Sequence, residues 1–321
     1  MESLVLKTDP GVIEVGDAER AVLAEVGARL VERPCTTEEE LLEHGRDAAA
    51  IVTLDEPLTA RVIAGLPGCR VISRFGIGVD KIDLNAATAA GIVVTNVPDY
   101  CVDEASDHAL ALLLAVSRRI LTLDRSVREG FWDTAAVAGP VRRLRGQRLG
   151  VLGFGRLGRS FAGKVAALGF EVVVHDPFVP DDAIEASGAR PLGLDELIAT
   201  SNALSLHVPL TPETRHLLNA GRIASMPPGA VVVNTSRGGL IDEAALIVAL
   251  REGRLFGAGL DVFETEPPPL DSPLLALPNV VVTSHSSHYS LESGEAMRDR
   301  AFRNVALVLS GREPLSRVNA Q

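Results

Sequence analysis

Arginine, carboxylate and histidine side chains follow three successive apolar runs in the second half of the chain. Arg237 lies in a glycine-rich segment, where its guanidinium can direct a fork of donors at a planar carboxylate. The next run is followed by Asp261, Glu264 and Glu266, and the last by His285. A carboxylate close to a histidine stabilises the imidazolium form, which makes an acid–base pair. Taken singly, these features are also typical of a surface arginine and a solvated acidic turn.

The segment Gly153-Phe154-Gly155-Arg156-Leu157-Gly158 has the spacing of a dinucleotide-binding turn. It follows the apolar run 149–152 and precedes a helical pattern over 159–168, and a second apolar run then leads to Asp176. In this motif the first glycine permits the tight turn, the second lets a pyrophosphate approach the backbone, and the third lets the helix pack on the strand. The start of the helix favours phosphates through its free N–H groups and its dipole.

Asp176 lies eighteen residues past the last glycine of this motif. A carboxylate at this place can accept both ribose hydroxyls of an adenosine, and it repels a 2′-phosphate. No lysine or arginine occurs in 177–189 to compensate such a phosphate. The sequence therefore predicts NAD rather than NADP, with a strand-end aspartate in a turn before Pro177 as the alternative.

The bulk composition limits the classes of function. A net charge of −11 without a basic run argues against nucleic-acid binding. Cys35, Cys69 and Cys101 lack metal-ligand spacing and predict reduced thiols. His285 and His288 are close in sequence, but no further ligand cluster accompanies them, so we expect no metal. No signal peptide or membrane-length apolar run is evident, and we expect a cytoplasmic protein without membrane contact.

Short β-branched runs alternate with helical patterns along the whole chain. Because the runs are continuously apolar and separated by helices, they predict α/β architecture with parallel sheets covered on both faces. The expected strands are 4–6, 50–52, 71–73, 92–95, 149–152, 172–174, 203–207, 230–234, 257–261 and 280–283. The expected helices are 38–43, 58–66, 102–119, 159–168, 183–187, 242–252 and 291–308.

Nearly 150 residues precede the glycine motif, so a complete α/β unit comes before the cofactor domain begins. The length of 321 residues agrees with about two domains. Pro98-Asp99 marks a break before the helix at 102–119, which is apolar nearly all round. Such a helix is typical of one buried between two domains.

Arginine, glutamate and histidine after successive late strands of a dinucleotide domain resemble the D-isomer-specific 2-hydroxyacid dehydrogenase family. The resemblance covers nearly the whole chain. It rests on the segments 73–80, 96–98, 153–158, 207–211, 234–239 and 261–267. The Arg74 loop and the segment 285–290 resemble most the branch that contains the C-terminal-binding proteins, which are dehydrogenase-like corepressors.

The resemblance implies two doubly wound parallel-sheet domains. A Rossmann NAD-binding domain at 100–288 would be inserted in a flavodoxin-like substrate-binding domain formed by 1–99 and 289–321. The helix at 291–308 would return to the N-terminal domain. The family also implies a homodimer, for which the helix after Pro98 and the loop at Phe131-Trp132 are candidate interface pieces, and a cleft that closes on hinges near Tyr100 and His288.

Residue roles follow from the same resemblance. Arg237 would bind the substrate carboxylate and polarise its 2-oxo group, and His285 would donate the proton in reduction. Glu266 would pair with His285, with Glu264 the weaker candidate. Backbone N–H groups of Gly76, Ile77 and Gly78 would form a second clamp for the carboxylate. The implied cofactor-binding residues are Gly153, Gly155, Arg156, Leu157, Gly158, Asp176, His207, Val208, Pro209, Thr235, Ser236 and Asp261.

The chain departs from the family pattern around the histidine. Ser284 replaces a proline, Ser286-Ser287 makes the segment polar, and His288 stands where the corepressor branch has a tryptophan. Together with Arg74 and Tyr100, His288 predicts a substrate with a second polar or anionic group. Alternatively, Arg74 braces its loop and Tyr100 packs at the hinge.

The resulting prediction is an NAD-dependent oxidoreductase. It would transfer a hydride between NADH and a 2-oxo acid to give the D-2-hydroxy acid, or the reverse, with that small molecule as its partner. One alternative is an NAD(H)-sensing, corepressor-like regulatory protein with residual catalysis. Another is a relative acting on phosphite or formate. The intact set of Arg237, Glu266 and His285 favours the 2-oxoacid enzyme.

Overall fold

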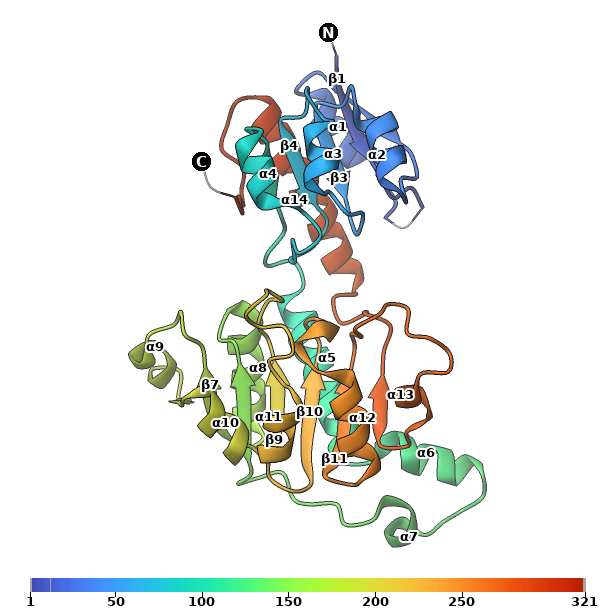
Figure 1. The fold of residues 1–321 in the computed structure, drawn as a ribbon, viewed down its shortest axis with the longest axis vertical. Coiled ribbons are helices and arrows are strands. Elements are labelled where there is room, and N and C mark those ends of the chain that lie inside the picture. Colours follow the sequence, from blue (N-terminus) through green and yellow to red (C-terminus); the bar gives the residue numbers. More distant parts are fainter. Residues whose placement is uncertain (1, 12, 320–321) are drawn as a thin grey trace. The chain divides into compact units, whose positions relative to one another are not determined.

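The computed structural model describes residues 2–11 and 13–319, which form two compact units. Unit 1 is drawn from residues 1–100 and 290–321, and unit 2 is residues 101–289. In the described residues each unit contains one sheet, and all paired strands in both sheets are parallel (Figure 1). The predicted α/β class with two parallel sheets is confirmed.

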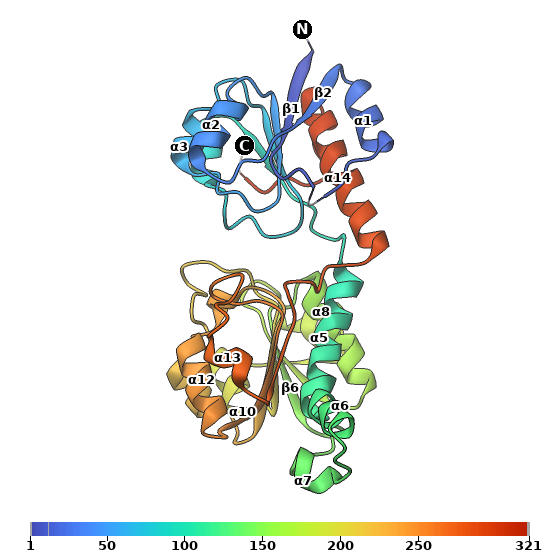
Figure 2. The same ribbon diagram turned by 90° about the vertical axis from the view of Figure 1, so that its right-hand side faces the viewer.

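Unit 1 has the strand order β2-β1-β3-β4-β5 across its described residues. Its strands are β1 (Ser3–Lys7), β2 (Ala28–Glu32), β3 (Ala50–Thr53), β4 (Val71–Arg74) and β5 (Val93–Thr95). Its helices are α1 (Asp17–Ala24), α2 (Glu38–Gly45), α3 (Ala60–Ala64), α4 (Leu84–Ala89) and α14 (Leu291–Leu309). Helices α1 and α14 pack on one face of the sheet, and α2, α3 and α4 on the other (Figure 2).

Unit 2 has the order β12-β11-β10-β9-β6-β7-β8 across its described residues. Its strands are β6 (Arg148–Leu152), β7 (Glu171–His175), β8 (Arg190–Pro191), β9 (Ala203–Leu206), β10 (Ala230–Asn234), β11 (Leu255–Leu260) and β12 (Val280–Val282). Its helices are α5 (Val102–Ser117), α6 (Ile120–Arg128), α7 (Thr134–Ala138), α8 (Arg156–Ala167), α9 (Asp181–Glu185), α10 (Leu194–Thr200), α11 (Ala220–Ser225), η1 (Gly238–Leu240), α12 (Glu243–Arg251) and α13 (Pro273–Ala276). Apolar side chains of α5, α8 and α9 cover one face, and those of α10 to α13 cover the other. Figure 2 shows α5 and α8 on one side of the sheet and α10, α12 and α13 on the other.

Helix α5 packs directly on the sheet of unit 2, against β10 and β11 and beside α8. Two glycines of β11 make this close approach possible. A Cβ added at Gly257 would lie 2.7 Å from Val116 Cγ1, and one added at Gly259 would lie 2.8 Å from Leu112 Cβ. The apolar character of α5 therefore has a cause within unit 2. No helix in the described part of the chain is both long and apolar enough to span a membrane.

The two strands that the sequence did not predict are both at sheet edges. β2 is partly exposed along most of its length, and β8 is a two-residue strand. An edge strand is partly solvated, so it need not carry a continuous apolar run. In unit 2 the strand order changes direction at β6, which lies between β7 and β9. Open parallel sheets bind ligands outside the carboxyl ends of their strands at such a point.

Candidate active site

The first and third glycines of the turn after β6 are required by the fold itself. Gly153 has φ +90°, and its N–H donates to His175 O at 2.9 Å. A Cβ at Gly153 would lie 2.6 Å from His207 O, and one at Gly158 would lie 2.0 Å from Gly153 O. Neither distance is compatible with a side chain. These glycines let α8 and the end of β9 approach the turn closely.

Gly155 is different, because nothing in the protein requires a glycine there. Its φ is −70°, which any residue adopts, and an added Cβ would have no neighbour within 4 Å. Gly155 is exposed and is the N-cap of α8, where no side chain caps the helix. Arg156 beside it is exposed, and Leu157 is half-buried. An open helix start with a bare backbone fits an anionic phosphate, so these residues fit a dinucleotide.

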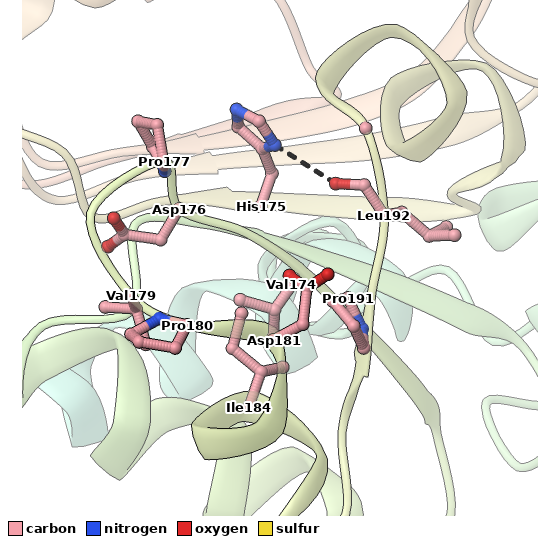
Figure 3. Close-up of a pocket in the computed structure, with 11 residues that line it drawn as sticks. Val174, His175, Asp176, Pro177, Val179, Pro180, Asp181, Ile184, Pro191 and Leu192 are labelled. Carbon is pink, nitrogen blue, oxygen red and sulfur yellow. Dashed lines mark hydrogen bonds between the residues drawn. The ribbon is translucent and has the colours of Figure 1, made fainter.

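Asp176 follows β7 and faces the glycine turn. Its Oδ2 accepts a hydrogen bond from Phe154 N at 2.7 Å, and its Oδ1 accepts one from Phe178 N at 2.9 Å. Asp176 also borders a pocket of about 370 Å³ between the end of β7, the start of α9 and the segment after β8 (Figure 3). Asp176 and Asp181 are the charged carboxylates of its lining, and no lysine or arginine is among the described residues that line it.

His207 follows β9 and lies against the other side of the glycine turn. Its Nε2 is 2.9 Å from Ser205 Oγ, and its ring centroid is 5.0 Å from that of Phe161 on α8. Burial lowers the pKa of His207 to about 4, so the ring is neutral at neutral pH. Val208 is half-buried and Pro209 is exposed.

The loop after β10 holds Arg237 in a rigid turn. Asn234 Oδ1 accepts from Ser236 N at 3.0 Å, and Asn234 Nδ2 donates to Arg237 O at 2.8 Å. Ser236 Oγ also donates to Leu206 O at 2.8 Å. The half-buried Arg237 donates from Nη1 to Ser236 O at 2.8 Å, and Thr235 is half-buried beside it.

A bare glycine joins this loop to the one after β11. A Cβ at Gly238 would lie 1.8 Å from the carbonyl carbon of Phe263, so the two loops are in direct backbone contact. This contact places Arg237 close enough to the carboxylate of Glu266 to influence its ionisation.

Glu266 and His285, which the resemblance pairs, are in direct side-chain contact. His285 Nδ1 lies 2.7 Å from Glu266 Oε2, and Phe263 N donates to Glu266 Oε1 at 3.0 Å. Burial favours the neutral acid, but the bonds from His285 and Phe263 and the charges of His285 and Arg237 outweigh it, so the pKa of Glu266 is lowered. The bond occupies Nδ1, which leaves Nε2 on the opposite side of the ring.

Glu264 is held elsewhere. Its Oε1 lies 2.9 Å from His216 Nε2 and accepts from Glu243 N at 3.2 Å. The geometry therefore separates the two glutamates, and Glu266 is the one that contacts His285. His288 lies near the same histidine, with ring centroids 6.4 Å apart.

Asp261, which the resemblance placed beside the nicotinamide, is 0% exposed. Its carboxylate accepts hydrogen bonds from Thr283 Oγ1, Ser286 N and Ser287 N. Asp261 thus lies beneath the loop that carries His285 and is bonded to residues of that loop. The polar Ser286-Ser287 segment supplies the two backbone donors.

Unit 1 brings together a second group of predicted residues. Gly76 has φ +110°, and a Cβ there would lie 2.1 Å from Arg74 Nη1 and 3.5 Å from Tyr100 Oη. Arg74 donates from Nε to Leu54 O at 3.1 Å, and its Nη2 lies 3.6 Å from Asp55 Oδ1. Arg74 therefore links the Gly76 loop to the segment after β3, and its role at the substrate stays a prediction.

The rest of the Gly76 loop is held by residues near the end of β5. Asn96 Nδ2 donates to Ile77 O at 2.7 Å, and Val97 N donates to Gly76 O at 2.9 Å. Gly78 is half-buried in the same loop. The loop's backbone is thus fixed close to Arg74.

Sequence reasoning missed two residues next to the His285 loop. His108 Nε2 on α5 lies 2.8 Å from Thr283 Oγ1 after β12, although the two residues are 175 positions apart in the sequence. A single histidine on an apolar helix gives no signal of such a contact.

Comparisons with known proteins agree with this fold. The family model described as D-isomer specific 2-hydroxyacid dehydrogenase, NAD binding domain, matches residues 110–287. A D-3-phosphoglycerate dehydrogenase from Archaeoglobus fulgidus is 43% identical over 77% of this chain and 47% of its own length. A glyoxylate reductase from Korarchaeum cryptofilum is 38% identical over 88% of this chain and 86% of its own. A crystal structure of D-lactate dehydrogenase from Aquifex aeolicus, complexed with NAD and lactic acid, matches at 28% identity and a TM-score of 0.86, covering 96% of each chain.

The fold and the matched domain define an oxidoreductase class with a Rossmann NAD-binding domain. The chain belongs to the D-isomer-specific 2-hydroxyacid dehydrogenase family. It spans about half the length of the curated phosphoglycerate dehydrogenases that it matches. The corepressor-like branch within the family stays a prediction.

Proposed function

We propose that the protein is an NAD-dependent D-2-hydroxyacid dehydrogenase that works on a small 2-oxo or 2-hydroxy acid. The observation that carries this proposal is the bond of 2.7 Å between Glu266 Oε2 and His285 Nδ1, in a loop layer that also holds Arg237. A histidine oriented by a carboxylate is suited to exchange a proton at its other ring nitrogen. An arginine beside it is suited to hold the carboxylate of a 2-oxo acid.

Each residue then has a specific task. Bound NADH supplies the hydride for C2 of the substrate. Arg237 binds the substrate carboxylate and polarises the 2-oxo group, and the backbone of Gly76, Ile77 and Gly78 provides further donors. His285 gives the proton on Nε2 to the developing alkoxide, while Glu266 holds the ring and stabilises its charged form. In oxidation the same groups act in reverse.

We further propose that NAD is preferred over NADP. Asp176 at the end of β7 would accept the ribose hydroxyls and would repel a 2′-phosphate. The lining of the adjacent pocket supports this, because its charged side chains, Asp176 and Asp181, are both acidic. Arg156 and Leu157 at the start of α8, the segment 207–209, Thr235 and Ser236 would complete the cofactor site.

For the substrate we propose a 2-oxo acid with at most a small polar second group, of the size of glyoxylate or hydroxypyruvate. The relatives named above include both a phosphoglycerate dehydrogenase and a glyoxylate reductase. Arg74 is the basic residue predicted to read a second anion, but its guanidinium already faces Asp55, as does Lys81. The carboxylate of Asp55 offsets one of these two positive charges, which weakens the attraction of this place for a phosphate. His288 and Tyr100 are the other polar residues that we propose for contact with the substrate.

We also propose a cytoplasmic homodimer that uses the segment after α5. Ile120 and Leu121 are about half exposed, Phe131 is 64% exposed, and Trp132 is 88% exposed. Large apolar side chains exposed close together in sequence are typical of an interaction surface. Sedimentation equilibrium measures the expected mass of two chains.

The test is NADH oxidation with a panel of glyoxylate, hydroxypyruvate, oxaloacetate, phosphonopyruvate and 3-phosphohydroxypyruvate. We expect turnover with glyoxylate and hydroxypyruvate, and a loss in kcat of about a thousandfold in His285→Ala. NADH affinity should be unchanged in that variant, and His44→Ala on α2 of unit 1 is the control. Tight NADH binding without turnover on the whole panel would favour the regulatory alternative. Turnover that survives His285→Ala would contradict the assigned mechanism.

A further inference from the structure

The loop that carries His285 is held in place by one buried carboxylate. Asp261 Oδ1 accepts from Thr283 Oγ1 at 2.6 Å and from Ser286 N at 2.8 Å, and Oδ2 accepts from Ser287 N at 2.9 Å. The backbone oxygen of Asp261 also accepts from His285 N at 2.8 Å. These bonds attach to residues on both sides of the histidine.

His285 needs such support because its backbone is strained. Its φ is +53°, a left-handed conformation that few residues other than glycine adopt readily. A strained residue persists where its surroundings over-determine it. Asp261 therefore fixes both the backbone of His285 and the direction in which its ring leaves the loop.

His108 reaches this network from α5. Its Nε2 lies 2.8 Å from Thr283 Oγ1 and 3.6 Å from Asp261 Oδ1. Burial opposes the charge of Asp261, but donors from Thr283, Ser286 and Ser287 outweigh it and lower the pKa of this carboxyl, so it accepts and does not donate. The single hydroxyl proton of Thr283 is thus used on Asp261, and Thr283 Oγ1 can only accept from His108. The arrangement requires a proton on His108 Nε2.

The order of bonds is then fixed from α5 to the loop. His108 Nε2–H donates to Thr283 Oγ1, the Thr283 hydroxyl donates to Asp261, and Asp261 accepts from Ser286 and Ser287. Removing a donor from a buried network leaves its acceptor unpaired, so the effect passes to the remaining members.

We propose that His108 is a positioning residue for His285, acting through Thr283 and Asp261. This inference rests on the proposed function, because it assigns His108 to the reaction in which His285 exchanges the proton. His108 contacts neither reactant in this role. It keeps the loop in the arrangement in which Nδ1 of His285 contacts Glu266 and Nε2 faces away from it.

The test compares His108→Leu with His108→Gln. Leucine removes the donor, whereas glutamine places an amide N–H near the position of Nε2. We expect kcat with the best 2-oxo acid to fall about tenfold in His108→Leu, with KM for NADH unchanged, and to recover largely in His108→Gln. His44→Leu, on α2 of unit 1, is the matched control. Equal losses in the two His108 variants, or an unchanged kcat in His108→Leu, would overturn the inference.

A second measurement does not depend on activity. Hydrogen exchange of the amides of Ser286 and Ser287 should be faster in His108→Leu than in the wild type and in His108→Gln. If no 2-oxo acid is turned over by the wild type, the proposed function fails while this measurement still reports on the network. If the wild type is active but neither kcat nor the amide exchange of Ser286 and Ser287 changes in the His108 variants, only the role of His108 is refuted.

Discussion

The two halves of the unit 2 sheet carry their functional groups by different means. At the β6–β7 end, backbone shapes the turn: Gly153 and Gly158 allow close contacts, and the amide of Phe154 binds Asp176. At the β10–β12 end, side chains hold side chains. Glu266 holds His285 there, and a buried aspartate anchors the loop beneath it.

This difference predicts how each half responds to change. A site made of backbone tolerates most side-chain replacements around it. Its selectivity between NAD and NADP then depends on one carboxylate, that of Asp176. A site made of paired side chains loses more than one interaction when one member is removed, because the partner is left unsatisfied. We therefore expect changes near β10–β12 to affect catalysis, and changes near β6–β7 to affect the choice of cofactor.

Among the effects predicted from this comparison, the largest separates the two glutamates after β11. Glu266→Gln removes the charge that stabilises the protonated His285, so kcat should fall about a hundredfold. Glu264→Gln is the matched change two residues earlier, and it acts on a carboxylate bound to His216 and Glu243. It should leave kcat close to the wild-type value. Steady-state kinetics with saturating NADH measures both.

Equal losses in these two variants would mean that the acidic loop acts as a whole. The different contacts of Glu266 with His285 and of Glu264 with His216 and Glu243 would then have no separate effect on catalysis. NADH affinity serves as the internal check, because neither glutamate should alter it.

A smaller effect is expected for cofactor choice at the other half of the sheet. Asp176→Asn retains an acceptor for the turn but removes the charge facing a 2′-phosphate. The ratio of kcat/KM for NADH to that for NADPH should fall about tenfold, which corresponds to about 1.4 kcal/mol. Asp181→Asn removes a carboxylate from the same pocket lining and is the matched control. An equal change in both variants would show that overall charge, and not Asp176, decides the preference.

The same contrast explains what could be predicted from the sequence. The turn from Gly153 to Asp176 is local in sequence, so its spacing alone identified it. The Glu266–His285 pair joins two strand ends, and resemblance to a family supplied that partnership. Nothing in the sequence linked His108 to Thr283, because the pairing depends on how α5 packs on the sheet.

Unit 1 shows a second limit of prediction from sequence, which is the choice between two roles for one residue. The sequence singled out Arg74 and left two roles open for it, and the contact with Leu54 and Asp55 supports the bracing role. Asp55 follows a different strand, so the charge it offers to Arg74 was not evident from the local pattern. The edge strands β2 and β8 were missed for a related reason, since their partly exposed residues form no apolar run.

The smallest effect concerns pH and distinguishes two histidines at the same edge of the sheet. His285 is about a third exposed and bound to a carboxylate, whereas burial lowers the pKa of His207 from 6.5 to about 4. Above pH 6.5 His207 is neutral in both the folded and unfolded states, and it has no effect. Between pH 6.5 and 4 the unfolded chain binds the extra proton, so stability falls as the pH falls.

At pH 5 this linkage costs at most about 2 kcal/mol relative to pH 7. His207→Gln keeps a side chain that can bond to Ser205 but cannot take up a proton, so its free energy of unfolding should lose less on acidification. Ser205→Ala should keep the wild-type dependence, because burial and not the bond to Ser205 lowers the pKa of His207. Urea unfolding at pH 7 and pH 5 measures the difference. If the free energy of unfolding falls equally from pH 7 to pH 5 in the wild type and in His207→Gln, protonation of His207 does not cause the loss of stability.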